Sequence, residues 1–195
     1  HRCFPQFSPE DFWLRRHRFD HYFALVDQFV TPSDFLRNRY IDWGISPDRI
    51  VTIENGQPDR SALPPRPLAV GETRNRFGFF GQINRFKGVD VLLEALIGLP
   101  RKQRRRLMLE VHGANLEHQP ETFRHRIKAM RAELEADRVL HWVGPYESHQ
   151  MPARLAAIDW VMVPSIWWEN SPMVIQEAFA YGRPVIASDI GGMAE

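Results

Sequence analysis

Short apolar runs alternate with amphipathic stretches from residue 76 almost to the end of the chain. The predicted strands are residues 76–80, 107–112, 139–143, 160–163 and 184–187. Helical spacing of apolar side chains separates them, first in Val89, Leu92, Leu93, Leu96 and Ile97 and then in Phe123, Ile127, Met130 and Leu134. Two further helices are expected at 149–158 and from Pro172 onward. Strands that alternate with helices in this way predict the α/β class, with a Rossmann-like, doubly wound parallel sheet.

The first part of the chain has a different pattern. We expect a helix from Pro9, a helix end that leads into a buried strand over residues 23–31, a helix over 33–40, and a strand over 49–54 that Asn55 and Gly56 stop. Four prolines and a glycine make residues 57–73 a linker. The predicted organisation is therefore a domain remnant (1–56), a linker (57–73) and the Rossmann-like domain (74–195).

Parallel sheets bind ligands at the carboxyl ends of their strands, so the candidate binding loops are residues 81–88, 113–116, 144–148 and 165–171. The last of these, the turn before the last helix, holds the most candidate site residues. Ser171 is predicted to be the N-cap and Pro172 the first helical residue. The N–H groups of Met173 and Val174 then lie at a helix end with partial positive charge, which suits a phosphate or diphosphate.

Two carboxylates flank that helix start. Glu169 lies on the loop, where it could orient a sugar hydroxyl or stabilise positive charge on an anomeric carbon. Glu177 follows on the second helical turn, where it could accept two ribose hydroxyls. The alternative is that both glutamates cap the helix and lie in solvent.

The loop after the first strand of the sheet brings cations to a helix start. Gly81 permits close backbone approach, while Arg85 and Lys87 can meet phosphate oxygens. The alternative is ordinary surface charge. The loop is neither a dinucleotide-binding fingerprint nor a Walker loop. Trp167 and Trp168 could offer an apolar platform to a sugar ring, although we expect one of them in the core.

Several segments in order resemble the nucleotide-sugar site of the retaining GT-B glycosyltransferases of family four (glycosyl transferases group 1). They are the pair Glu169 and Glu177 at E-x7-E spacing, the run GRPVIA, and the later Gly191 and Gly192. The first loop is similar to that family's G-R-x4-K-G motif, with Gln82 where the family commonly has Arg. The resemblance covers roughly residues 23 to 195.

This resemblance implies roles for particular residues. Lys87 would bind the diphosphate, Glu169 the donor sugar and Glu177 the ribose, with Glu169 and Lys87 as the catalytic pair. The remaining donor contacts would come from the loops and the helix start: Gly81, Gln82, Arg85, Tyr146, Ser171, Pro172, Met173 and Val174. Tyr146 lies where the family approaches the nucleobase, and either stacks on the base or packs on its own loop.

The resemblance also implies an activity. The parent enzyme would transfer a hexosyl group from a UDP- or GDP-sugar to a carbohydrate or lipid-linked acceptor, with retention and without a metal or further cofactor. It would be cytoplasmic, with peripheral contact to the inner face of the membrane through the N-terminal, acceptor-side domain. Two alternatives are a nucleotide-sugar epimerase of GT-B fold and a non-catalytic nucleotide-binding or assembly module.

Composition adds few constraints. The 195 residues are 44% hydrophobic, carry a net charge of +1 and contain one cysteine, which excludes an intrachain disulfide and a cysteine-cluster metal site. Nothing in this balance calls for nucleic acid, and His112 and His141 are expected to be satisfied interior or surface residues. The basic run 101–106 is either a solvated connection or a patch for anionic lipid heads or phosphates. Since the first residue is His1 and the last predicted strand ends only a few residues before Glu195, we expect a fragment. Because most of the acceptor-side domain would then be missing, we expect it to bind nucleotide at best and not to catalyse transfer alone.

Overall fold

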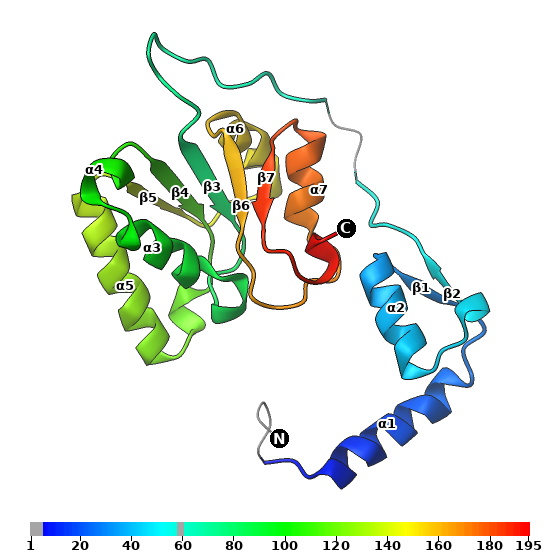
Figure 1. Cartoon of the computed structure of the whole chain (residues 1–195). Helices are drawn as coiled ribbons and strands as arrows, with labels where there is room; N and C mark the ends of the chain where they lie inside the picture. The colour runs from blue at the N-terminus through cyan, green and yellow to red at the C-terminus, as the bar shows by residue number, and fades with distance from the viewer. Residues whose placement is uncertain (1–5, 58–60) are drawn as a thin grey trace. The chain divides into compact units, whose positions relative to one another are not determined.

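The computed structural model describes residues 6–57 and 61–195. The chain forms two compact units, His1–Glu54 and Asn55–Glu195, which are described here one at a time. Figure 1 shows the helices and strands of both.

The first unit contains a two-stranded parallel sheet, in which β1 (Phe29–Thr31) pairs with β2 (Ile50–Thr52). Ser8 is the N-cap of helix α1 (Pro9–Phe23). Ser33 is the N-cap of α2 (Asp34–Trp43), and its Oγ accepts the N–H of Leu36 at 3.2 Å. A 3-10 turn, Pro47–Arg49, precedes β2. The helix predicted from Pro9 is confirmed. The expected buried strand is wrong for Val30, which is 58% exposed, because only Thr31 of β1 turns inward.

The second unit is built on a five-stranded parallel sheet in the order β5-β4-β3-β6-β7 (Figure 1). Its strands are β3 (Arg76–Phe80), β4 (Met108–His112), β5 (Leu140–Gly144), β6 (Trp160–Val163) and β7 (Val185–Ala187). All five predicted strands are confirmed, and β3 and β6 begin and end at the predicted residues.

Helices cover both faces of this sheet. Helices α3 (Val89–Gly98) and α5 (Glu121–Ala136) bury their apolar side chains with Phe79, whereas α6 (Met151–Ala156) and α7 (Met173–Ala180) bury theirs with Phe80. Successive residues of a strand point to opposite faces, so the neighbours Phe79 and Phe80 enter two separate cores. The sheet is therefore doubly wound, as the sequence predicts. Short 3-10 turns occur at Arg85–Lys87, Leu116–His118, Ser148–Gln150 and Gly191–Met193.

A short helix, α4 (Arg101–Arg104), occupies the basic run and was not predicted. Arg104 is only 8% exposed, and its guanidinium lies 2.6 Å from Asp137 Oδ2. Arg101 and Arg105 bind the other oxygen of the same carboxylate at 2.6 and 3.0 Å. The hydrogen bond from Arg101, followed by that from Arg104, lowers the pKa of Asp137. A solvated connection is thus the wrong description of Arg104, because Asp137 gives it a buried partner.

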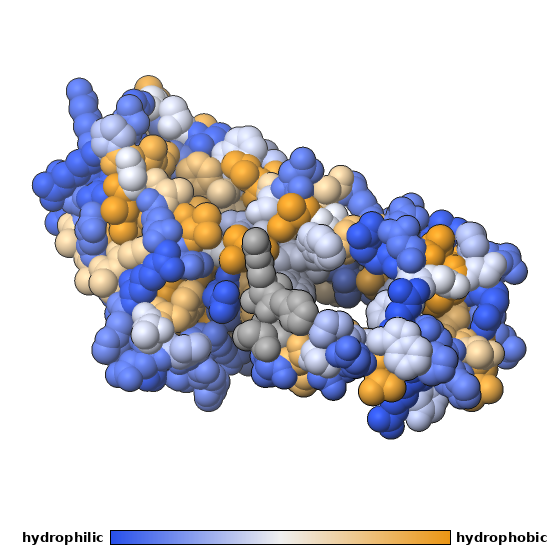
Figure 2. All heavy atoms as spheres, turned by 60° about the horizontal axis from the view of Figure 1, so that its bottom comes forward, coloured by the Kyte–Doolittle hydropathy of each residue, from blue (hydrophilic) through white to orange (hydrophobic). Residues whose placement is uncertain are grey.

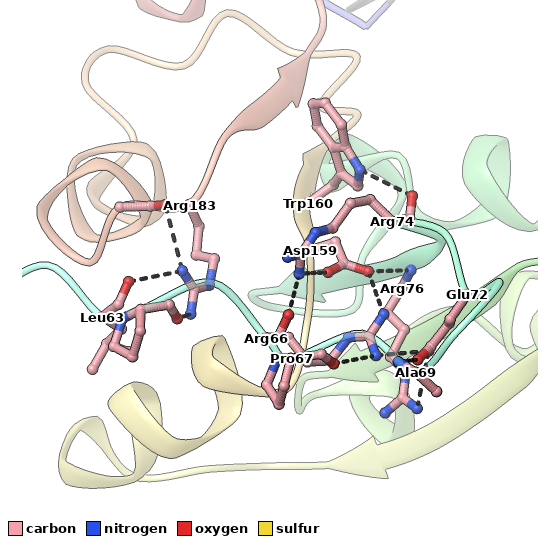
Figure 3. A network of polar contacts seen from close by, with 12 residues as sticks. Leu63, Arg66, Pro67, Ala69, Glu72, Arg74, Arg76, Asp159, Trp160 and Arg183 are labelled. Atoms are coloured by element: carbon pink, nitrogen blue, oxygen red, sulfur yellow. Dashed lines mark hydrogen bonds and ion pairs between the residues drawn. The ribbon is translucent and has the colours of Figure 1, made fainter.

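The proline-rich segment packs on the Rossmann-like unit. Arg183 donates to the carbonyl oxygens of Leu63 and Pro64 at 3.2 and 2.8 Å, and the buried Arg66 binds Asp159 at 3.0 Å (Figure 3). Burial alone would raise the pKa of Asp159, but hydrogen bonds from Arg66 and Arg74 outweigh it and hold that pKa below its usual value. Arg66 and Arg74 therefore tie this segment to Asp159, the residue before β6.

Candidate functional site

The order of the strands places two loops next to each other. The chain runs from β3 outward through β4 and β5, then crosses back to β6 on the other side of β3. The loops after β3 and β6 consequently leave the sheet side by side, at its topological switch point. Gly88 has a φ of 68°, and a Cβ there would lie 1.8 Å from the carbonyl oxygen of Pro164. Only glycine lets the two loops approach this closely.

Asn84 shapes the first of these loops. Its Oδ1 accepts the N–H groups of Phe86 and Lys87 at 2.9 and 3.1 Å and so starts the 3-10 turn Arg85–Lys87. The carbonyl of Phe86 accepts the N–H of Ile166 at 2.9 Å, which ties this turn to the loop after β6. Sequence reasoning missed Asn84, although an Asn before a helical turn is itself a capping signal.

Lys87 and Glu169 meet across the two loops. Lys87 Nζ lies 2.8 Å from Glu169 Oε1, and Ser165 donates its Oγ–H to the same oxygen at 2.9 Å. The side chains of Lys87 and Glu169 are 34% and 16% exposed, so the ion pair is largely shielded but open to solvent on one side. Ser165 was not singled out in the sequence, and its burial at 1% exposure marks it as part of the support for Glu169.

Gly192, near the end of the chain, packs against the backbone of the Glu169 loop. Gly192 donates its N–H to the carbonyl of Glu169 at 2.7 Å. A Cβ on Gly192 would lie 2.0 Å from the carbonyl oxygen of Asn170, so no other residue fits without moving the loop. The role of this glycine is therefore to pack against the backbone that carries Glu169.

Helix α7 starts one residue later than predicted. Its first residue is Met173, and Pro172 is the N-cap, with extended backbone and no side-chain hydrogen bond. Ser171 is not the cap, because it lies one position too early and its Oγ accepts from Gln176 Nε2 at 3.1 Å. The first-turn N–H groups, those of Met173 and Val174, still lack intrahelical acceptors at this end, as in any α-helix. Gln57, also missed in the sequence, donates to Gln176 Oε1 at 2.9 Å beside this helix start.

Tyr146 packs against residues of β3 and β4. Its ring makes edge contacts with Phe80 and His112, at centroid distances of 5.8 and 6.3 Å, and Arg154 lies 5.6 Å from the ring centre. Burial raises the pKa of the Tyr146 phenol, and the negative charge of Glu177 raises it further. The half-buried Glu177 is therefore close enough to Tyr146 to interact with it electrostatically.

The other predicted residues of the first loop lie elsewhere. Gln82 is exposed, and Gly81 donates its N–H to the carbonyl of His112 at 3.0 Å. Arg85 lies over the ring of Phe86 at 5.4 Å and lines a cavity of about 450 Å³ with residues of α5, whereas Lys87 and Glu169 do not line it. Of the two predicted cations, the structure places Lys87 but not Arg85 at the glutamate.

The expectation that one tryptophan belongs to the core is wrong. Trp167 and Trp168 are 58% and 56% exposed, because the loop between β6 and α7 runs over the surface. Trp167 touches Phe86 edge-on at 5.2 Å. Figure 2 brings the bottom of Figure 1 forward, and hydrophobic and hydrophilic side chains are interspersed on the face that it shows.

His112 is an interior residue with two polar partners. Its Nε2 lies 3.1 Å from Glu110 Oε2 and its Nδ1 lies 2.9 Å from an Arg154 nitrogen, while its ring stacks on Phe80. Among residues 6–57 and 61–195, no group of three His, Cys, Asp or Glu side chains could hold a metal ion. Within the same ranges, no helix is both long and apolar enough to cross a membrane.

Comparison with known proteins gives a consistent picture. Residues 65–195 match the family Glycosyl transferases group 1. The D-inositol 3-phosphate glycosyltransferase of Corynebacterium aurimucosum is 31% identical over 176 residues, which are 84% of this chain and 41% of that protein. The mannosylfructose-phosphate synthase of Agrobacterium fabrum is 28% identical over 160 residues, 78% of this chain and 35% of that protein. The chain thus spans less than half the length of these relatives.

Solved structures with a similar fold include Anabaena Alr3699/HepE in complex with UDP, with a TM-score of 0.67 and 20% identity over 86% of this chain and 46% of that one. A glycosyltransferase from Rickettsia africae has a TM-score of 0.67 and 22% identity over 91% of this chain and 48% of that one. The fold is that of the Rossmann-like domain of GT-B glycosyltransferases.

Proposed function

Because the chain belongs to the glycosyl transferases group 1 family, we propose that it supplies the donor site of an enzyme that moves a hexosyl group from a UDP- or GDP-sugar to an acceptor with retention. The observation that carries this proposal is the contact of Lys87 with Glu169 at the switch point of the sheet. The similar Anabaena structure was solved with UDP, which favours a nucleoside diphosphate as the ligand.

Lys87 and the start of α7 would share the charge of the leaving diphosphate. The ammonium group is a compact point charge, and the first-turn N–H groups add partial positive charge from the peptide dipoles. Such pre-arranged charge acts most strongly on the transition state, where the bond between the anomeric carbon and the diphosphate oxygen breaks. Arg85, which lies away from Glu169, would contribute less than Lys87.

The two glutamates would hold the sugars on either side of the diphosphate. Glu177 would accept the ribose hydroxyls near the Tyr146 loop, and Glu169 would accept a hydroxyl of the donor sugar while Ser165 keeps it in place. The acceptor oxygen would then attack on the face that the diphosphate leaves. Its proton would pass to a leaving phosphate oxygen, so that neither a metal nor a separate base is needed.

The acceptor of the whole enzyme would be a carbohydrate or a lipid-linked carbohydrate, met at the cytoplasmic face of the membrane. Relatives are named for transfer to inositol 3-phosphate and for synthesis of mannosylfructose phosphate, which favours a small polyhydroxylated acceptor. We expect the present 195 residues to bind donor nucleotide, and transfer to require the full-length protein.

Calorimetric titration of the chain with UDP, GDP and ADP tests the donor site. We expect one diphosphate to bind, and Glu177→Ala to weaken it by about tenfold through loss of the ribose contacts. Glu117→Ala removes an exposed carboxylate elsewhere and serves as the matched control. Failure of the wild-type chain to bind any of the three nucleotides would overturn the proposal. Equal affinity in wild type and Glu177→Ala would overturn only the assignment of Glu177 to the ribose.

A further inference from the structure

A second cavity lies at the opposite edge of the sheet from Lys87, beside the amino ends of β3, β4 and β5. Its volume is about 360 Å³. Four guanidinium groups and two carboxylates line it, those of Arg76, Arg105, Arg106, Arg138, Glu72 and Glu110. Because parallel strands bring all their amino ends to one edge, this cavity is separate from the donor loops.

Both carboxylates already have partners. Glu72 accepts from Arg66 at 2.7 Å and from the Ala69 N–H at 3.0 Å (Figure 3), and Glu110 lies 3.1 Å from the His112 ring nitrogen. The arginines have fewer carboxylate partners. Arg105 binds Asp137 and Arg76 lies 3.8 Å from Glu72.

Arg106 and Arg138 make no ion pair within the part of the chain that the structure describes. The cavity therefore holds two guanidinium groups whose charge no neighbouring carboxylate of the described chain takes up.

The backbone at Arg138 adds an independent observation. This residue follows the end of α5 with a φ of 59°, while its N–H and that of Val139 turn back to the carbonyls of Glu135 and Leu134 at 2.9 Å each. A helix that ends in this way usually has glycine at the left-handed position, because other residues are strained there. Here the left-handed position is held by Arg138, whose side chain lines the cavity. A strained backbone at such a place favours a functional role for the side chain.

We propose that this cavity, which we call the arginine pocket, binds the phosphate group of a ligand. Guanidinium groups present paired N–H donors in the fork geometry that phosphate oxygens accept, and Arg106 and Arg138 are available for it. The phosphate belongs either to a free phosphorylated compound or to the headgroup of an anionic lipid. In both cases the site is distinct from the donor diphosphate site.

Titration with inorganic phosphate at low salt tests the free ligand, and flotation with phosphatidylcholine vesicles that contain phosphatidylglycerol tests the lipid. The test variant is Arg106→Gln/Arg138→Gln. The control Lys102→Gln/Lys128→Gln removes the same charge from exposed residues that do not line the cavity. All measurements are made in a Lys87→Met background, so that phosphate at the donor site does not contribute.

We expect the control to bind like its background and the test variant to bind at least about tenfold more weakly. Loss of phosphate binding without any flotation identifies a free ligand, whereas flotation that depends on Arg106 and Arg138 identifies a lipid headgroup. The single variant Arg138→Gly removes a guanidinium but relieves the backbone, so weaker binding together with a raised Tm separates ligand loss from misfolding. Binding that is absent in the background, or equal in the test and control variants, overturns the arginine pocket.

Discussion

Glu169 Oε1 lies 2.8 Å from Lys87 Nζ, although 82 positions separate the two residues in the chain. In this structure the ammonium group of Lys87 is paired with a carboxylate, whereas the proposed mechanism pairs it with the leaving diphosphate. When a donor binds, Lys87 must divide its hydrogen bonds between Glu169 and the phosphate oxygens. The two residues should therefore respond to substitution in opposite directions when nucleotide binding is measured.

Lys87→Met should weaken UDP or GDP binding and slow transfer by the full-length enzyme. Removal of one donor that stabilises developing negative charge costs about 3 kcal/mol, so kcat should fall by about 10²–10³-fold. Steady-state kinetics on the full-length variant measure this. Lys128→Met, on the exposed side of α5, is the control. A variant that keeps wild-type kcat would exclude Lys87 from the reaction.

Glu169→Gln should raise the affinity for free nucleoside diphosphate while it lowers turnover. The amide no longer competes for Lys87 and no longer repels the diphosphate, a gain on the order of 1 kcal/mol at a partly exposed site. Calorimetry with UDP and kinetics with the donor sugar give the two readings. If affinity falls as much as in Lys87→Met, Glu169 instead holds the nucleotide itself.

Gly88→Ala should destabilise the Rossmann-like unit. The new methyl group would overlap the carbonyl oxygen of Pro164, and alanine at a φ of 68° carries a further penalty of about 1–2 kcal/mol. Urea unfolding followed by circular dichroism measures the loss. Gly98→Ala, in a helical position with no atom within 4 Å of the added Cβ, should be neutral or stabilising by up to about 1 kcal/mol. Equal stability of the two variants would contradict the close packing of the loops.

Protonation of Asp159 at acid pH should weaken the packing of the proline-rich segment on the Rossmann-like unit. Its folded-state pKa lies below the ordinary value of 3.8, so its contribution to stability is present above that pH and is lost as the pH falls through the lower, folded-state pKa. Asp159→Asn should cost up to about 3 kcal/mol at neutral pH, because the buried Arg66 loses one of its two carboxylate partners and keeps only Glu72. Urea midpoints at several pH values should show a smaller acid-induced loss in the variant than in wild type, and an equal loss would refute this role.

Much of the Rossmann-like unit could be predicted from the sequence, since strands such as Trp160–Val163 and the apolar stripe of α5 follow strict periodicities. The sequence placed the loops of Lys87 and Glu169 at the carboxyl ends of their strands, but the strand order that makes these loops neighbours came only from the structure. The roles of these residues in binding and catalysis stay predictions.

Other features depend on contacts between segments that are distant in sequence. The burial of Arg104 depends on Asp137, 33 residues later, and the Ser171 hydroxyl accepts from Gln176 instead of capping α7. Local patterns carry little information on such choices. The exposure of both tryptophans was missed for the same reason, because hydrophobicity alone does not tell a surface loop from a core.

The hydrogen bond from the Gly192 N–H to the carbonyl oxygen of Glu169 couples the backbone near the end of the chain to the loop that carries Glu169. Substitutions in residues 188–193 should therefore move the backbone at Glu169, and with it the proposed contact to the donor sugar, without changing Lys87, Ser165 or Glu169 themselves.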